Sequence, residues 1–198
     1  MVTGASIETA GGLYTKALEA TRRYVAAVRD NQWDAPTPCT EWNVHQLLNH
    51  TVYEIVWVDE IFAGKTVAEV GDRFDGDFLG PDPLAAYDAA ARAAKRAVLA
   101  PGALETVCYL RRGDTSGAAY ATSMFIDVFI HGWDIAKAIG QDASLELGLV
   151  SAAYAIVEPR KGQPQTVRAF APQIEVTEGA ELQAKLLGIL GRPADWRP

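Results

Sequence analysis

The chain has 198 residues, of which 49% are hydrophobic, which is enough for one sizeable core. Its formal net charge of -7 and isoelectric point near 5.0 argue against binding to nucleic-acid phosphates, and no run of Lys or Arg provides a local exception. Because the sequence has neither a secretory leader nor a stretch of about 18 apolar residues, we expect a cytoplasmic protein that does not engage membranes.

The two cysteines, Cys39 and Cys108, form no Cys-x-x-Cys pair, and we expect both to be reduced thiols. This excludes a structural zinc site built from four thiolates. Cys39 follows Pro38 in a segment rich in turn formers, where two interpretations stay open. It is either a thiol partly activated near a helix N-terminus or a small packed side chain.

Helical patterns dominate the N-terminal half of the chain. Apolar positions at helical spacing predict a first helix over about Ile7 to Asp30, followed by a segment rich in proline. A second helix is predicted over about Glu41 to Ala63. Thr40 is a suitable N-cap for it, and Gly64 is a suitable end.

Two more helices are predicted in the middle of the chain. An alanine-rich segment favours a helix over about Leu84 to Leu99, before Pro101. The stretch from Ala103 to Gly117 is expected to be irregular. A long helix then covers about Ala118 to Ile139, and Gly140 terminates it as a left-handed cap.

The C-terminal part is predicted to be mixed. One helix is expected over about Leu145 to Val157 and another near Ala180 to Leu190. Between them, the segments Thr166 to Phe170 and Gln173 to Thr177 favour β-structure.

Four long helices with no strand pairs between them predict an all-α protein, specifically an up-down four-helix bundle. We expect one helical domain over residues 1–158 and a short mixed C-terminal extension over residues 159–198, packed on the bundle. Such bundles build metal sites from inward side chains on facing helices, and a homodimer through a helix face is compatible with this class.

The second predicted helix carries polar residues beside its apolar face. Glu54 falls inside the apolar arc, His50 lies at the edge of the arc one turn earlier, and His45 projects from the opposite edge toward solvent. A carboxylate that points into a core must be paired, protonated or bound to a cation. Glu54 could therefore pair with Arg22 or Arg23, and His50 could be a hydrogen-bonded histidine at the core boundary.

The fourth long helix places Ser123, Asp127, His131 and Asp134 along one narrow stripe, with apolar residues over the rest. Asp127 and His131 are four residues apart and therefore lie one turn apart on the same face. Either this stripe is exposed and holds a weak ion pair, or it lines a polar cavity in which both side chains bind a metal ion.

Three segments carry a resemblance to a known family. They are Thr37–His50 with the following Val52-Tyr-Glu54, then Asp127–Ala136, and the closing Leu190–Trp196. Their sequence, order and separation resemble the DinB-like helical-bundle metal-binding superfamily. The group concerned is related to the N-terminal domain of mycothiol-dependent maleylpyruvate isomerase, and the resemblance spans almost the whole chain.

The resemblance implies that His50, Asp127 and His131 bind a divalent metal ion, zinc first and nickel as the alternative. Three protein ligands leave a coordination position for water, substrate or a low-molecular-weight thiol such as mycothiol or bacillithiol. Glu54 would then hold the His50 imidazole in one tautomer or act as a catalytic general base. The isomerase carries Glu at the position of Asp127 and has a large C-terminal domain, so we do not transfer its reaction to this chain.

Three functions remain open at this point. The first is a metal-dependent thiol transferase or isomerase whose partners are a small-molecule thiol and an electrophile. The second is a metal-binding protein without catalysis, acting in stress response or metal handling. The third is a structural helical domain whose histidines are ordinary core residues.

Overall fold

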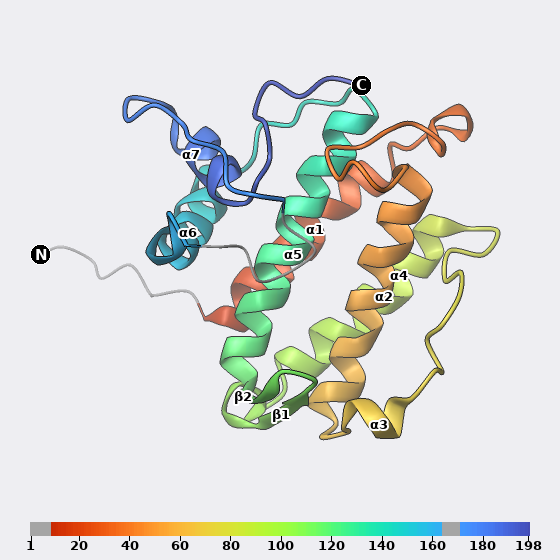
Figure 1. The fold of residues 1–198 in the computed structure, drawn as a ribbon. Helices are drawn as coiled ribbons and strands as arrows, with labels where there is room; N and C mark the ends of the chain where they lie inside the picture. The colour runs from red at the N-terminus through yellow and green to blue at the C-terminus, as the bar shows by residue number, and fades with distance from the viewer. Residues whose placement is uncertain (1–8, 164–170) are drawn as a thin grey trace, which may run out of the picture.

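The computed structural model describes residues 9–163 and 171–198. These residues are mostly helical, with one two-stranded sheet among them (Figure 1). The four long helices are α1 (Ala10–Val25), α2 (Val44–Phe62), α4 (Pro83–Val98) and α5 (Gly117–Ala138). Helix α1 packs on α4 and α5, and α2 packs on the same two helices. The predicted predominance of helix is therefore confirmed. None of the described helices is long and apolar enough to cross a membrane.

Shorter elements lie around these helices. They are α3 (Val67–Val70), β1 (Val107–Leu110), β2 (Gly113–Ser116), α6 (Leu147–Val157) and α7 (Leu182–Ile189), with 3-10 turns at Asp30–Gln32, Ala103–Glu105 and Glu158–Arg160. Helices α6 and α7 pack on each other, whereas the β1–β2 hairpin lies at one end of the long helices (Figure 1).

The prediction of irregular structure before α5 was wrong for residues 107–116. Strands β1 and β2 pair antiparallel there, with Leu110 opposite Gly113 and two arginines in the turn. Gly113 has φ +109°, a conformation that favours glycine. Cys108 points inward from β1 and is fully buried, so the hairpin covers one end of the core.

Helix α2 begins at Val44, three residues later than predicted, because Asn43 and not Thr40 caps it. The Asn43 side chain accepts from the Gln46 backbone N–H at 2.9 Å, and the Gln46 side chain accepts from the Asn43 backbone N–H at 3.0 Å. This reciprocal pair satisfies two amides of the first turn. Helix α1 ends at Val25 and not at Asp30, and its predicted first residue, Ile7, lies outside the described residues.

Helix α5 is the central helix of the fold, since 16 of its 22 residues are buried. Helix α1 approaches it closely at Gly132, where a Cβ would lie 2.4 Å from Thr21 Oγ1. The Thr21 hydroxyl donates to the Val128 carbonyl at 3.0 Å across this contact. Because α5 is surrounded on most sides, two of its polar residues, His131 and Asp134, are fully buried.

The described part of the C-terminal extension contains α7 and no strand. The prediction of β-structure at Gln173–Thr177 was wrong, although this segment runs beside α7 and the Ile174 N–H donates to the Gly188 carbonyl at 2.9 Å. The other β-prone segment, Thr166–Phe170, lies outside the described residues.

Candidate metal centre

The packing of α2 on α5 brings His50, Asp127 and His131 together. One donor atom from each residue lies within 4.8 Å of the other two. His131 Nε2 is 3.6 Å from Asp127 Oδ1, and the two imidazole rings lie nearly perpendicular with centroids 5.3 Å apart. Two donors bound to one tetrahedral zinc-like ion are about 3.4 Å apart, so this spacing approaches that of a metal site.

The polar stripe of α5 does not face solvent at this point. The His131 side chain is 0% exposed and that of Asp127 is 17% exposed. The interpretation of Asp127 and His131 as a water-exposed ion pair is therefore wrong. Of the four residues in this stripe, only Ser123, one turn before Asp127, is exposed.

Three buried atoms of this cluster have no hydrogen-bond partner among the described residues. They are His50 Nε2, His131 Nε2 and Asp127 Oδ2. A buried polar atom without a protein partner is costly, and such atoms are satisfied by ordered water or by a bound ion. A divalent cation accepts electron pairs from two imidazole nitrogens and a carboxylate, so the donor set fits such an ion. The interpretation of His50 as a hydrogen-bonded core histidine leaves its Nε2 unexplained.

The two imidazoles have different proton affinities. Burial lowers the pKa of His50 to about 4, so this ring is neutral near pH 7 and can act as a ligand. Burial also lowers the pKa of His131, but the charge of Asp127 and the hydrogen bond with Asp134 outweigh it and raise the value to about 10. A metal ion must therefore displace a proton from His131.

Glu54 lies one turn after His50 on α2 and is partly buried. Burial and the nearby charge of Asp127 raise its pKa to about 7. The suggested partners of Glu54 on α1 bond elsewhere. Arg22 pairs with Asp88 through two bonds of 2.7 Å, and Arg23 donates to the Tyr24 hydroxyl and to a backbone carbonyl.

Tyr14 on α1 is a further polar residue near this site, and the sequence analysis did not identify it. It is fully buried, and its hydroxyl has no hydrogen-bond partner among the described residues. Burial raises its pKa well above the usual value, and the charges of Asp127 and Glu54 add to this effect. The signal that could have identified it is a tyrosine at helical spacing from the buried residues Ala17 and Leu18.

Cys39, His131 and Asp134 form a second group of potential ligands that shares one imidazole with the first. A positive charge already lies beside this second group. The Arg192 guanidinium donates to Asp134 at 2.9 Å and to Cys39 Sγ at 2.8 Å, so it occupies the place that a metal ion would take. Burial raises the pKa of the Cys39 thiol, which favours the packed side chain over the activated thiolate. Arg192 lies in the closing segment Leu190–Trp196, and no prediction from the sequence assigned a role to it.

A cleft of about 510 Å³ reaches His50 from the side of α2 and the segment after α3. Trp42, Tyr53 and Phe74 supply aromatic walls, and Asp75 and Asp77 supply carboxylates. The Trp42 ring lies 4.5 Å from the His50 ring, between centroids. His45, which the sequence placed toward solvent, also lines this cleft and lies 3.5 Å from Asp77.

Comparison with known proteins identifies related sequences. The sequence model of the family described as "Mycothiol maleylpyruvate isomerase N-terminal domain" matches residues 14–136. Two uncharacterized proteins of Mycobacterium tuberculosis, MT0763 and Rv0738, are each 32% identical over 183 residues, covering 90% of this chain and 95% of the relative. No solved structure matches the chain.

Proposed function

The chain belongs to the mycothiol maleylpyruvate isomerase N-terminal domain family, and from this premise we propose that it binds one divalent metal ion through His50, Asp127 and His131. The observation that carries the proposal is the cluster of three unpartnered buried donor atoms on α2 and α5. Zinc is the expected metal and nickel the alternative, because the donors are two nitrogens and one carboxylate.

The proposal also covers the fold that carries the site. The contacts of α1 and α2 with both α4 and α5 close a ring, which supports an up-down four-helix bundle of the DinB-like type. Residues 1–158 would form this domain, and residues 159–198 would form an extension packed on it. The hydrogen bonds between Arg192 and Asp134 support this arrangement.

We further propose that the protein is a metal-dependent thiol transferase or isomerase. Three protein ligands leave one position open, and a bound divalent ion supplies Lewis acidity and lowers the pKa of a coordinated thiol or water. The cleft beside His50 offers space for a mycothiol-type thiol or its electrophilic partner. Its aromatic and acidic walls would orient the ligand.

Glu54 is the residue of this chain that we propose to move the proton. Its carboxyl group has a pKa of about 7, so it can accept a proton from a thiol S–H or from water near neutral pH and return it later. These two features, the cleft and Glu54, favour catalysis over a metal-handling role without chemistry.

Zinc titration of the EDTA-treated protein tests the metal site. We expect one zinc ion per chain, and loss of tight binding in His50→Ala, Asp127→Ala and His131→Ala. His45→Ala is the matched control, since it removes a partly exposed histidine from the same helix and should keep one zinc ion. Equal zinc binding by all four variants would refute the site.

A second assay separates the enzyme from the metal-handling protein. The zinc-loaded chain is mixed with mycothiol and an aryl halide, and the thioether product is measured. We expect Glu54→Gln to keep zinc but to lose most of the transfer rate, whereas Asp59→Asn, an exposed acid on the same helix, keeps both. Zinc binding without any thioether formation would support the non-catalytic alternative.

A further inference from the structure

Arg192 is a buried arginine behind the metal site. It follows α7 and is 2% exposed. Its Nε donates to both oxygens of Asp134 at 2.9 and 3.1 Å, and its Nη2 donates to Asp134 Oδ2 at 2.9 Å. The same Nη2 lies 2.8 Å from Cys39 Sγ, in the loop that leads to α2. One side chain thus ties the C-terminal segment to α5 and to the entry of α2.

Asp134 passes this restraint on to a proposed metal ligand. Its Oδ2 lies 3.0 Å from His131 Nδ1, and both side chains are 0% exposed. With Nδ1–H donating to Asp134, His131 directs Nε2 toward His50 and Asp127. A carboxylate that accepts from the far nitrogen of a metal-binding imidazole fixes both its tautomer and its orientation.

The charge balance explains why an arginine is needed. Asp134 is a fully buried carboxylate, and Arg192 is the fixed cation that compensates it. Without the guanidinium, the buried carboxylate would lose its permanent countercharge and, with it, its fixed position. The ion pair of Arg192 and Asp134 therefore holds the carboxylate in place beside His131 Nδ1.

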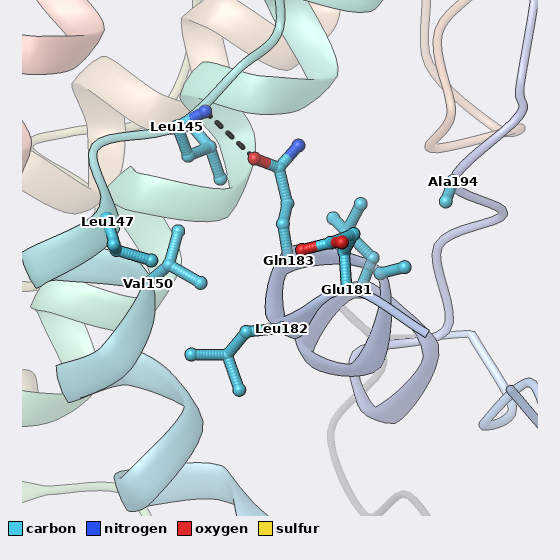
Figure 2. A pocket seen from close by; sticks show the side chains of 9 residues that line it. Leu145, Leu147, Val150, Glu181, Leu182, Gln183 and Ala194 are labelled. Carbon is cyan, nitrogen blue, oxygen red and sulfur yellow. Dashed lines mark hydrogen bonds between the residues drawn. The ribbon is translucent and has the colours of Figure 1, made fainter. Parts of the chain in front are cut away.

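The chain that leads to Arg192 is held at two points, Gln183 and Gly191. The Gln183 side chain accepts from Leu145 N–H at 2.9 Å, at the edge of a pocket of about 380 Å³ between α6 and α7 (Figure 2), and donates to Ala143 O at 3.0 Å. Gly191, just before Arg192, has φ +69°, and a Cβ there would lie 2.2 Å from the Ala171 carbonyl oxygen. The position of Arg192 is therefore set by the docking of α7.

We propose that Arg192 is a positioning residue for the metal site, and that metal binding is coupled through Asp134 to the docking of residues 182–192. This inference rests on the proposed metal site. The family match ends at residue 136, so the coupling adds a component from outside the matched region. By linkage, the factor by which docking raises metal affinity equals the factor by which metal favours docking.

The first experiment measures zinc affinity of the full chain by competition with a chromophoric chelator. Loss of a residue that hydrogen-bonds directly to a metal ligand lowers metal affinity about 10- to 100-fold. Because Arg192 acts one contact further away, through Asp134, we expect Arg192→Met to lie at the lower end, with a loss of about 10-fold. Arg192→Lys keeps the positive charge but lacks the planar guanidinium that donates to both Asp134 oxygens. Its zinc affinity should therefore lie between those of the parent chain and Arg192→Met. Arg197→Met is the matched control, because it removes an exposed arginine from the same segment and should bind zinc like the parent chain.

The second experiment measures amide hydrogen exchange in residues 182–192 with and without zinc. We expect zinc to slow exchange in the parent chain and in Arg197→Met, but not in His50→Ala. The last variant lacks a ligand but retains Arg192, Asp134 and His131. This readout needs no Arg192 variant, so it decides the proposal even if Arg192→Met does not fold.

The outcomes separate the two proposals. If the parent chain binds no zinc, the proposed metal site itself is wrong. If the parent chain binds zinc but exchange in residues 182–192 does not change, or folded Arg192→Met binds zinc equally well, only the positioning role is overturned.

Discussion

Replacing Gly132 with alanine tests the close contact between α1 and α5 beside the metal site. The added Cβ would lie 2.4 Å from Thr21 Oγ1 and 3.2 Å from Thr21 Cβ, inside a buried interface. Thr21 cannot turn away without losing its hydrogen bond to the Val128 carbonyl. Overpacking costs up to about 3 kcal/mol, and the 2.4 Å contact places this site at the upper end.

The helix itself opposes this loss, because alanine is favoured over glycine in a helix interior by about 1 kcal/mol. We therefore expect Gly132→Ala to lower the free energy of unfolding by about 2 kcal/mol, as the difference of the two terms. Urea unfolding of the EDTA-treated protein, followed by circular dichroism, measures this change.

A double-mutant cycle with Thr21→Ala provides the control. Thr21→Ala removes the atom that the new Cβ would strike, so the cost of Gly132→Ala should fall to less than about 0.5 kcal/mol in this background. A stabilised Gly132→Ala variant, or the same loss in both backgrounds, would refute the steric argument and leave only helix propensity.

Three further predictions concern protons and the backbone. Because the pKa of metal-free His131 is about 10, zinc binding at pH 7 should release about one proton, and zinc affinity should fall as pH falls. Calorimetry in buffers of different ionisation enthalpy measures this, and zero release would contradict it. Arg22 holds the pKa of Asp88 below its usual value, so their stabilisation is present above the unfolded pKa of about 3.9 and is lost as pH falls through the folded value. Asp88→Asn should therefore weaken the acid dependence of the urea midpoint, and an unchanged dependence would count against the pair. Gly191→Ala should lower the thermal midpoint by at least about 2 °C, because φ is +69° and the Ala171 carbonyl lies where the new Cβ would be. An unchanged midpoint would show that the backbone moves to accommodate the methyl group.

The helices could be predicted from the sequence because apolar spacing is a local property. The predictions at Glu41–Ala63 and Ala118–Ile139 found α2 and α5 to within a few residues. The start of α2 was misplaced because Thr40 and Asn43 are both good N-caps, and only the reciprocal bonds with Gln46 select the second. The β1–β2 hairpin was missed because its strands are four residues each, too short for a clear period.

The local pattern also placed Asp127 and His131 on one face of α5, since a separation of four residues fixes that geometry in any helix. Whether this face meets water or the core depends on which helices pack against it, and no spacing within α5 contains that information. Burial of His131 and the approach of His50 are therefore results of the packing of α2 on α5.

The sequence by itself determined the helices, the acidic and apolar balance, and the two candidate faces on α2 and α5. Tertiary structure alone decided that these faces meet, that Tyr14 joins them, and that Arg192 lies behind Asp134. The physical reason is that helix periodicity acts over a few residues. The compensation of a buried charge, in contrast, acts through space, here between residues that are 58 positions apart in the chain.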